Sequence, residues 1–252
     1  MVILQQKGSK MSQNITVQHT PSKPVFPLNI GAGIKRVFPG FNFGDFAVIH
    51  GLSSVSSLTS MLCVQAQLPT QLGGIEGTVI FIDGGNTFNL YKVTKIAQMY
   101  KLNPKKVLEN IYLSRAFTAY QVNSLITQQL KETIKKLNAK LVIVSDISGF
   151  YLDTEIPDAE VQAIFNQTIE FLSDFAKENQ IIIITTYSPH METERNSLLQ
   201  KGCFTKANIV LSLNKTGCTR KLTIEKHPYH QLGVSEIPNV ECTLTNFSEV
   251  NA

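Results

Sequence analysis

Residues 46–59 read FAVIHGLSSVSSLT: an apolar run, a glycine, a short loop of small residues, and the start of a helical pattern. A strand that passes through a glycine-rich loop into a helix is the usual context of a phosphate-binding loop. No lysine follows Gly51 within this loop. The stretch therefore predicts the first strand and helix of an α/β domain, and it raises the question whether a nucleotide pocket is retained.

Strand-like and helix-like patterns alternate beyond this stretch. Five further strand-like runs are predicted at 78–83, 141–146, 181–186, 208–213 and 221–226. Four of the six runs are apolar throughout, which is typical of parallel strands covered on both faces. Between the runs, apolar residues recur at helical spacing in two stretches: Val122, Leu125, Ile126, Leu130, Ile134 and Leu137, and Val161, Ile164, Phe165, Ile169, Leu172 and Phe175. The fold class predicted is α/β, with a mostly parallel twisted sheet and helices on both faces.

The chain divides into three parts by composition. Residues 1–27 are polar and contain three prolines, which predicts an arm or linker. Residues 28–240 form the predicted core domain, and residues 241–252 a tail. Ligands of such sheets bind beyond the carboxyl ends of the strands. This rule directs attention to the loops at 50–57, 83–88, 146–156 and 187–201.

Composition argues against several kinds of site. The four cysteines (Cys63, Cys203, Cys218 and Cys242) form no C-x-x-C pair and no zinc-ligand spacing with histidines, so we expect reduced thiols and no metal. No apolar run is long enough to span a membrane, and the first residues lack the apolar core of a secretory signal. We expect an intracellular, cytoplasmic protein with no membrane partner. A net charge of +4 over 252 residues is a weak basic signal.

The loop after residue 50 departs from a Walker A loop. That motif uses backbone N–H groups, a lysine and a hydroxyl to hold phosphate and magnesium. If Ser56 takes the hydroxyl position, the loop is two residues short and Val55 replaces the lysine. The candidate degenerate nucleotide-binding loop comprises Gly51, Ser53, Ser54, Val55, Ser56 and Ser57. The alternative interpretation is that these serines cap the following helix.

Two longer stretches carry a family resemblance. QLPTQLGGIEGTVIFIDGGNTF (67–88) and LNPKKVLENIYLSRAFTAYQ (102–121) resemble the core domain of the RecA/RadA recombinases, especially archaeal RadA proteins and their paralogues. The similarity covers about residues 28–238. It implies a RecA-like, P-loop-type core.

The departures from that family fall on its catalytic positions. Gly85 stands where the family has an acidic base, and glycine has no group that accepts a proton. Ser145 aligns with the Walker B aspartate, and Asp146 replaces it only if the strand has ended or bulged there. Thr186 and Tyr187 stand at the polar sensor. The resemblance thus implies a pseudo-ATPase with no catalytic residue and no cofactor.

Contacts to DNA are predicted for residues in two loops and one hairpin. The loop at 147–160 contains four carboxylates and no lysine or arginine, and carboxylates repel phosphate. Phe150 and Tyr151 are candidates for base stacking, or else for packing. The remaining candidates are His190, Arg195, Lys201, Lys215, Arg220 and Lys221.

Three functions are weighed. The first is a catalytically inactive accessory factor in recombination and repair, which binds an active RadA-type recombinase or a sister paralogue, with or without single-stranded DNA, and can form a homo-oligomer. The second is a stand-alone single-stranded DNA binder. The third is a divergent ATP-binding enzyme with weak ATPase activity, in which Asp83 or Asp146 holds a metal.

Overall fold

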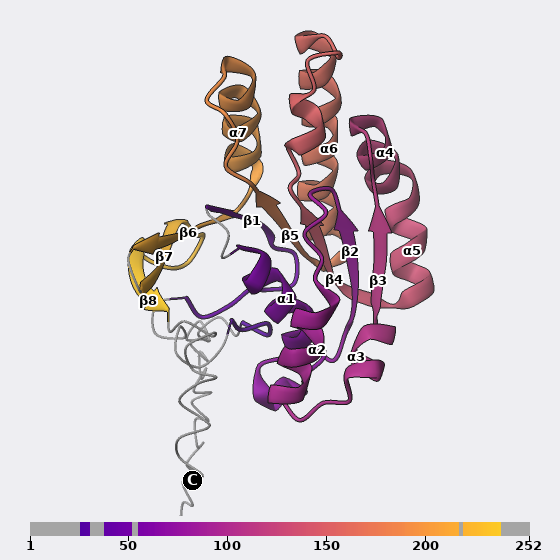
Figure 1. Cartoon of the computed structure of the whole chain (residues 1–252), viewed down its shortest axis with the longest axis vertical. Coiled ribbons are helices and arrows are strands. Elements are labelled where there is room, and N and C mark those ends of the chain that lie inside the picture. The colour runs from indigo at the N-terminus through magenta and orange to yellow at the C-terminus, as the bar shows by residue number, and fades with distance from the viewer. Residues whose placement is uncertain (1–25, 31–37, 52–54, 217–218, 238–252) are drawn as a thin grey trace, which may run out of the picture.

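The computed structural model describes residues 26–30, 38–51, 55–216 and 219–237, which form one eight-stranded sheet of order β3-β2-β4-β5-β1-β6-β7-β8 (Figure 1). The strands are β1 (Phe46–Gly51), β2 (Thr78–Asp83), β3 (Ile111–Arg115), β4 (Ala139–Ser145), β5 (Ile182–Tyr187), β6 (Ile209–Thr216), β7 (Thr219–Lys226) and β8 (Gly233–Ile237).

The sheet is parallel from β3 to β6 and antiparallel from β6 to β8. All six predicted strands are present within a few residues of their expected bounds. β3 and β8, the two edge strands, were not predicted from the sequence. Four of the five β3 residues are exposed or half-buried, so the strand lacks the continuous apolar run that marks the others.

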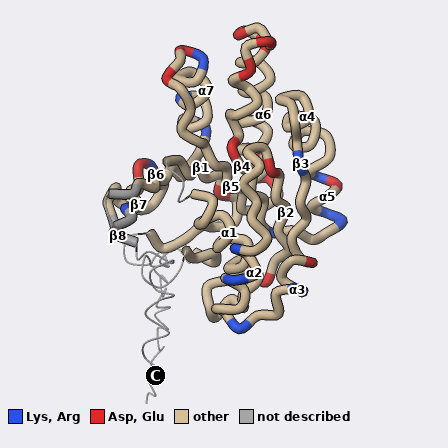
Figure 2. The backbone as a smooth tube through the Cα atoms, in the orientation of Figure 1, with Lys and Arg blue, Asp and Glu red and all other residues tan. Residues whose placement is uncertain are grey.

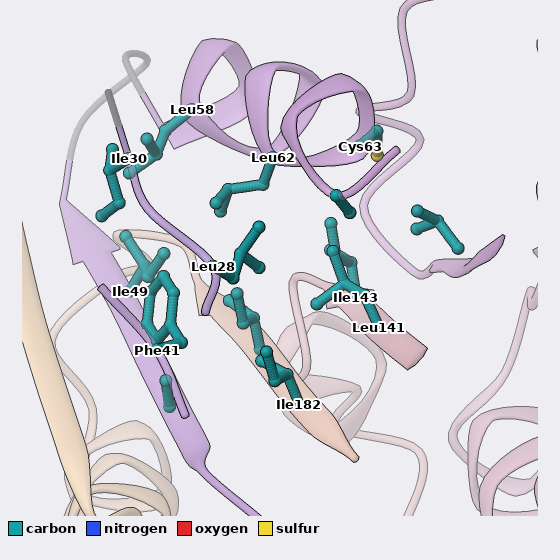
Figure 3. Packing of buried hydrophobic residues seen from close by; sticks show 14 of the residues in the cluster. Leu28, Ile30, Phe41, Ile49, Leu58, Leu62, Cys63, Leu141, Ile143 and Ile182 are labelled. Carbon is teal, nitrogen blue, oxygen red and sulfur yellow. The ribbon is translucent and has the colours of Figure 1, made fainter. Parts of the chain in front are cut away.

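Helices cover both faces of the sheet, as predicted. One face carries α1 (Val55–Gln65), α2 (Leu90–Met99) and α3 (Pro104–Glu109), and the other carries α4 (Ala119–Ser124), α5 (Leu130–Leu137), α6 (Asp158–Asn179) and α7 (Glu194–Lys206). Short 3₁₀ helices occupy Thr70–Leu72 and Gly149–Leu152. Because strand side chains alternate, Ala47 and Ile49 of β1 join the first core and Phe46 and Val48 the second. In Figure 3, Leu28, Phe41 and Ile49 pack beneath Leu58 and Leu62 of α1.

The helical stretch predicted around residues 122–137 is interrupted. A π-helical turn, Leu125–Gln129, separates α4 from α5. Ile126 and Leu130 remain buried across the interruption, so the apolar stripe is retained although the backbone hydrogen bonding changes. The long helix predicted from the second stripe is α6, without interruption.

The two cysteines within the described residues are structural, as expected. Cys63 and Cys203 are fully buried in the two cores. Burial raises the pKa of both thiols, that of Cys203 to about 12, so neither is a reactive thiolate at neutral pH. Cys218 and Cys242 lie outside the described residues. Across the described part of the chain, no helix has the length and apolar character required to cross a membrane.

Candidate functional site

The carboxyl ends of β1, β2, β4 and β5 meet at one edge of the sheet, and Asp83 at the end of β2 is fully engaged there. Asp83 is 2% exposed. Its Oδ1 accepts hydrogen bonds from the Thr87 N–H (2.8 Å) and from the Ser145 hydroxyl (2.7 Å), and its Oδ2 accepts one from the Phe88 N–H (3.3 Å). Arg115 Nε lies 3.7 Å from Oδ2. The carboxylate therefore holds the following turn, and both of its oxygens already accept hydrogen bonds.

Ser145 and Gly85 complete this network. Ser145, the last residue of β4, is 1% exposed and also accepts the Gly85 N–H at 3.3 Å. The hydroxyl thus links the ends of β2 and β4. The side chains of Asp83 and Ser145 are both almost completely buried.

Asp146 occupies the space beside Gly85. The strand has ended at Ser145, and Asp146 adopts the left-handed backbone conformation with φ +48°. Its N–H donates to Thr186 Oγ1 at 2.8 Å. A Cβ added to Gly85 would lie 2.8 Å from the Asp146 Cβ, and one added to Gly149 would lie 2.7 Å from its Oδ2. Two glycines therefore make room for the Asp146 side chain.

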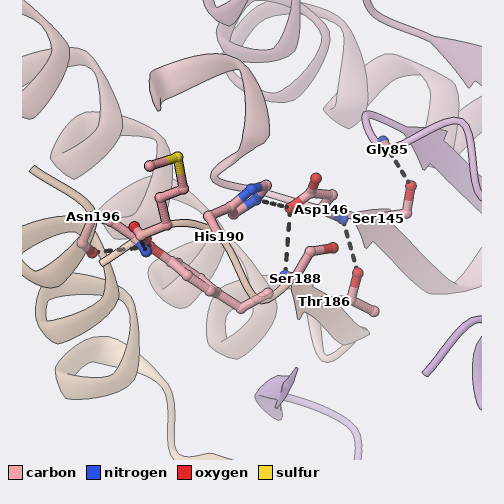
Figure 4. A network of polar contacts seen from close by, with 9 residues as sticks. Gly85, Ser145, Asp146, Thr186, Ser188, His190 and Asn196 are labelled. Atoms are coloured by element: carbon pink, nitrogen blue, oxygen red, sulfur yellow. Dashed lines mark hydrogen bonds and ion pairs between the residues drawn. The ribbon is translucent and has the colours of Figure 1, made fainter. Parts of the chain in front are cut away.

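The carboxylate of Asp146 binds the loop after β5 (Figure 4). His190 Nε2 lies 2.9 Å from Asp146 Oδ1, and the Ser188 N–H donates to the same oxygen at 3.4 Å. The Tyr187 hydroxyl donates to the Asn196 side-chain oxygen at 2.6 Å, and burial raises the pKa of this phenol. The Tyr187 hydroxyl is therefore hydrogen-bonded to α7.

The predicted nucleotide loop is described in part. Leu52, Ser53 and Ser54 lie outside the described residues. Ser56 donates to the Thr87 carbonyl at 3.3 Å, and Val55 is buried in the first core. A cavity of about 120 Å³ adjoins these residues and is lined by Gly51, Val55, Ser56, Thr59, Thr87, Thr186, Tyr187, Ser188 and Pro189. It is smaller than ligand pockets, which hold roughly 300 Å³ or more, and among the described residues no charged side chain lines it.

Two basic side chains near this edge were missed by the sequence analysis. Lys92 Nζ donates to the Ser57 hydroxyl at 2.9 Å, and Arg115 approaches Asp83 as described above. Lys92 lies 35 residues after Ser57, so no local spacing rule connects them. Within the described residues, no group of three or more His, Cys, Asp or Glu side chains is arranged to hold a metal ion.

Two residues predicted to contact DNA serve internal packing. Tyr151 is completely buried, with its ring against Phe165 and its hydroxyl 3.1 Å from Thr168 Oγ1. Its ring is therefore unavailable to a base, and the packing alternative is the one observed. Arg195 donates to the Asp153 and Ile156 carbonyls and pairs with Asp158. It fastens the acidic loop after β4 to the start of α7.

The other candidates are distributed over two regions. His190 pairs with Asp146 and its side chain is 25% exposed. Lys201 is exposed on α7. Lys215 and Arg220 are opposite one another in the backbone register of β6 and β7, and Lys221 is half-buried in β7. Contacts of these residues to DNA stay predictions.

Strand order and edge chemistry together define a class. A mostly parallel sheet of order 3-2-4-5-1, followed by an antiparallel extension, with a glycine loop after β1 and an aspartate ending β2, is an α/β core of the RecA type.

Comparisons with known proteins identify the family. The Rad51 family model matches residues 27–208, and the chain belongs to this family. It is 30% identical over 162 residues to the meiotic recombination protein DMC1 of Saccharomyces cerevisiae, which covers 62% of this chain and 46% of that protein. The DNA repair and recombination protein RadA of Aeropyrum pernix is 29% identical over 158 residues, which are 63% of this chain and 47% of that protein. The RadA protein of Cenarchaeum symbiosum is 32% identical over 123 residues, which are 48% of this chain and 29% of that protein. The chain therefore matches less than half the length of each of these relatives.

Proposed function

We propose that the chain is a catalytically inactive member of the Rad51 family that acts as an accessory factor in homologous recombination and repair by binding an active recombinase. The observation that best supports this proposal is the polar network at the carboxyl edge of the sheet. In it, Asp83, Ser145 and Asp146 form hydrogen bonds with other groups of the protein. Phosphoryl transfer depends on positioned cations and carboxylates that act on the nucleotide and its metal. Here the carboxylates stabilise turns of the protein.

The loss of a phosphate-neutralising cation supports the same proposal. Val55, which stands where the family's lysine is expected, is buried in the first core. Lys92 is the one cation that contacts the described start of α1, and it is bonded to Ser57. The alternative of a weak ATPase would require Lys92 to leave Ser57 and to take the role of the missing lysine.

Nucleotide binding is tested by thermal unfolding of the purified chain with and without ATP and magnesium, alongside an active RadA-type recombinase as the positive control. A ligand that binds the folded state raises the unfolding temperature by mass action. Because we propose that this chain does not bind ATP, we expect its unfolding temperature to stay unchanged. Lys92→Ala is the matched variant. A shift of several degrees that disappears in Lys92→Ala would favour the weak ATPase and contradict the proposal.

The accessory role is tested with the recombinase of the native host. We expect the two proteins to co-elute in size-exclusion chromatography and the recombinase's strand-exchange rate to change on addition of this chain. Absence of co-elution at micromolar concentration, together with an unchanged strand-exchange rate, would refute the role.

A further inference from the structure

Positive charge is concentrated in α2, α3 and the turn between them. Residues 89–110 contain five lysines and one glutamate, so their net charge of +4 equals that of the entire chain. Lys92 donates a hydrogen bond to the Ser57 hydroxyl, and the other four lysines are exposed. These four define the lysine surface: Lys95, Lys101, Lys105 and Lys106. None of them forms a salt bridge with a carboxylate of the described residues.

The fold does not require these lysines. Lys101 adopts the left-handed conformation with φ +57°, which glycine adopts without strain and which costs other residues about 1–2 kcal/mol. Lys105 is the second residue of α3, at the end where the helix dipole disfavours positive charge. At Lys101 and Lys105, therefore, the local backbone is better suited to another residue.

An exposed aromatic side chain extends the lysine surface along α2. Tyr91 is 84% exposed and precedes Lys95 by four residues, so the two share one face of the helix. Met99, four residues after Lys95, is 44% exposed on the same face. Aromatic rings between cations are the combination that stacks and neutralises single-stranded nucleic acid.

The opposite end of the molecule repels polyanions. Asp153, Glu155, Glu160, Glu192 and Glu194 are exposed around the starts of α6 and α7, and Arg195 is committed to the Asp158 carboxylate. Figure 2 shows acidic positions at the tips of α6 and α7, with a basic position also at α7, whereas the positions coloured as charged along α2 and at the far end near α3 are mainly basic. A nucleic acid would be directed away from the loops at the carboxyl edge.

We propose that the lysine surface, with Tyr91, binds the phosphate backbone of nucleic acid, single strands in preference to duplexes. This site lies outside the loops in which DNA contacts were sought from the sequence. It goes beyond the proposed accessory role and does not depend on it, because it is a property of the isolated chain.

The site is tested by fluorescence anisotropy of a labelled oligothymidylate with the purified chain over a range of salt. Each phosphate contact contributes about −0.7 to the slope of log K against log salt. The quadruple variant is Lys95→Gln/Lys101→Gly/Lys105→Gln/Lys106→Gln. Because four contacts are removed, its slope should be less negative than that of the wild type by up to about 2.8. At roughly 50 mM salt we expect its affinity to be reduced at least about tenfold, with the fold intact because Lys101→Gly relieves the positive φ.

A charge-matched control removes four exposed lysines from other helices: Lys131→Gln, Lys135→Gln, Lys136→Gln and Lys177→Gln. It should retain most of the affinity and slope. Tyr91→Ala should weaken single-strand binding several-fold and leave duplex binding unchanged, since only unpaired bases stack on the ring. The proposal would be overturned if both quadruple variants lost the same affinity for the oligothymidylate, or if the variant of the lysine surface kept wild-type affinity. It would also be overturned if the wild-type chain bound polyglutamate as tightly as the oligothymidylate.

Discussion

At the residue scale, Gly85 stands where the family resemblance leads one to expect an acid. The space beside this glycine contains the side chain of Asp146, which in turn contacts His190. Introducing an acid at Gly85 is therefore a packing problem as well as a chemical one. The substitution at one position depends on its neighbour.

The first prediction concerns Gly85→Glu. The new Cβ would lie 2.8 Å from the Asp146 Cβ and 3.0 Å from the Thr87 Cγ2, so we expect a loss of about 1–3 kcal/mol of unfolding free energy. Asp146→Gly removes the clash and suits the positive φ at this position. In urea denaturation, the loss of unfolding free energy in the double variant should be smaller than the sum of the losses in the two single variants. Strictly additive effects would show that the two side chains do not compete for space.

The second prediction concerns Ser145→Asp, which restores the acid expected at Walker B. The Ser145 hydroxyl donates to Asp83 at 2.7 Å, and a carboxylate there would face another carboxylate. We expect a loss of about 3 kcal/mol or more at pH 7, reduced at pH 5 because one carboxyl group can then hold a proton. Ser145→Asn, of similar size, still has a donor and should cost less. Similar costs for both variants at pH 7 would contradict the electrostatic explanation.

The element scale concerns loops that hold each other. Arg195 at the start of α7 donates to the Asp153 and Ile156 carbonyls and pairs with Asp158 at the start of α6. A guanidinium presents five donors from three nitrogens in one plane, so it can reach three separated acceptors, whereas the three donors of a lysine share one nitrogen. The loop after β4 is thus positioned by a residue that lies 37 to 42 positions further along the chain.

The third prediction concerns Arg195→Ala. Losing the three contacts should cost about 1–2 kcal/mol, since hydrogen bonds to a charged group are involved and Asp158 is largely exposed. Amide hydrogen exchange in residues 153–158 should accelerate, while the strands remain protected. Arg195→Lys should restore little of this protection, and Lys201→Ala on the same helix should leave exchange unchanged. Unaltered exchange in Arg195→Ala would mean that other contacts hold the loop.

Sequence predicted the central elements better than the edges. Apolar runs such as residues 181–186 identify buried parallel strands, because both faces of such a strand are covered. Exposed β3 has no such run, and the π-helical turn at Leu125–Gln129 leaves the apolar spacing unchanged, so neither is evident in the pattern. The loops at 83–88 and 146–156 do follow the carboxyl ends of neighbouring parallel strands, as the alternating pattern predicted. The pairing of Lys92 with Ser57, and of Asp146 with His190, depends on tertiary contacts between distant residues and was not predicted.

At the scale of the whole molecule, a glycine lies where the central strand β1 pairs with β6. Gly51 ends β1 and pairs with Leu213 of β6, the strand at which the parallel part meets the antiparallel part. Its φ is +121°, and an added Cβ would lie 2.2 Å from the Leu213 carbonyl oxygen. The glycine that looks like the start of a phosphate loop thus has a structural role whether or not phosphate is bound.

The fourth prediction concerns Gly51→Ala. Backbone strain and the contact with Leu213 should together cost about 3 kcal/mol, because a rigid carbonyl must move and β1 lies in the middle of the sheet. Gly202→Ala is the matched control: it lies within α7 with its nearest contact 3.3 Å from a side-chain atom, and alanine favours helix. Thermal unfolding should show a large decrease for the first variant and no decrease for the second. Equal unfolding temperatures would mean that the end of β1 can shift away from β6, and that the glycine is then retained for another reason.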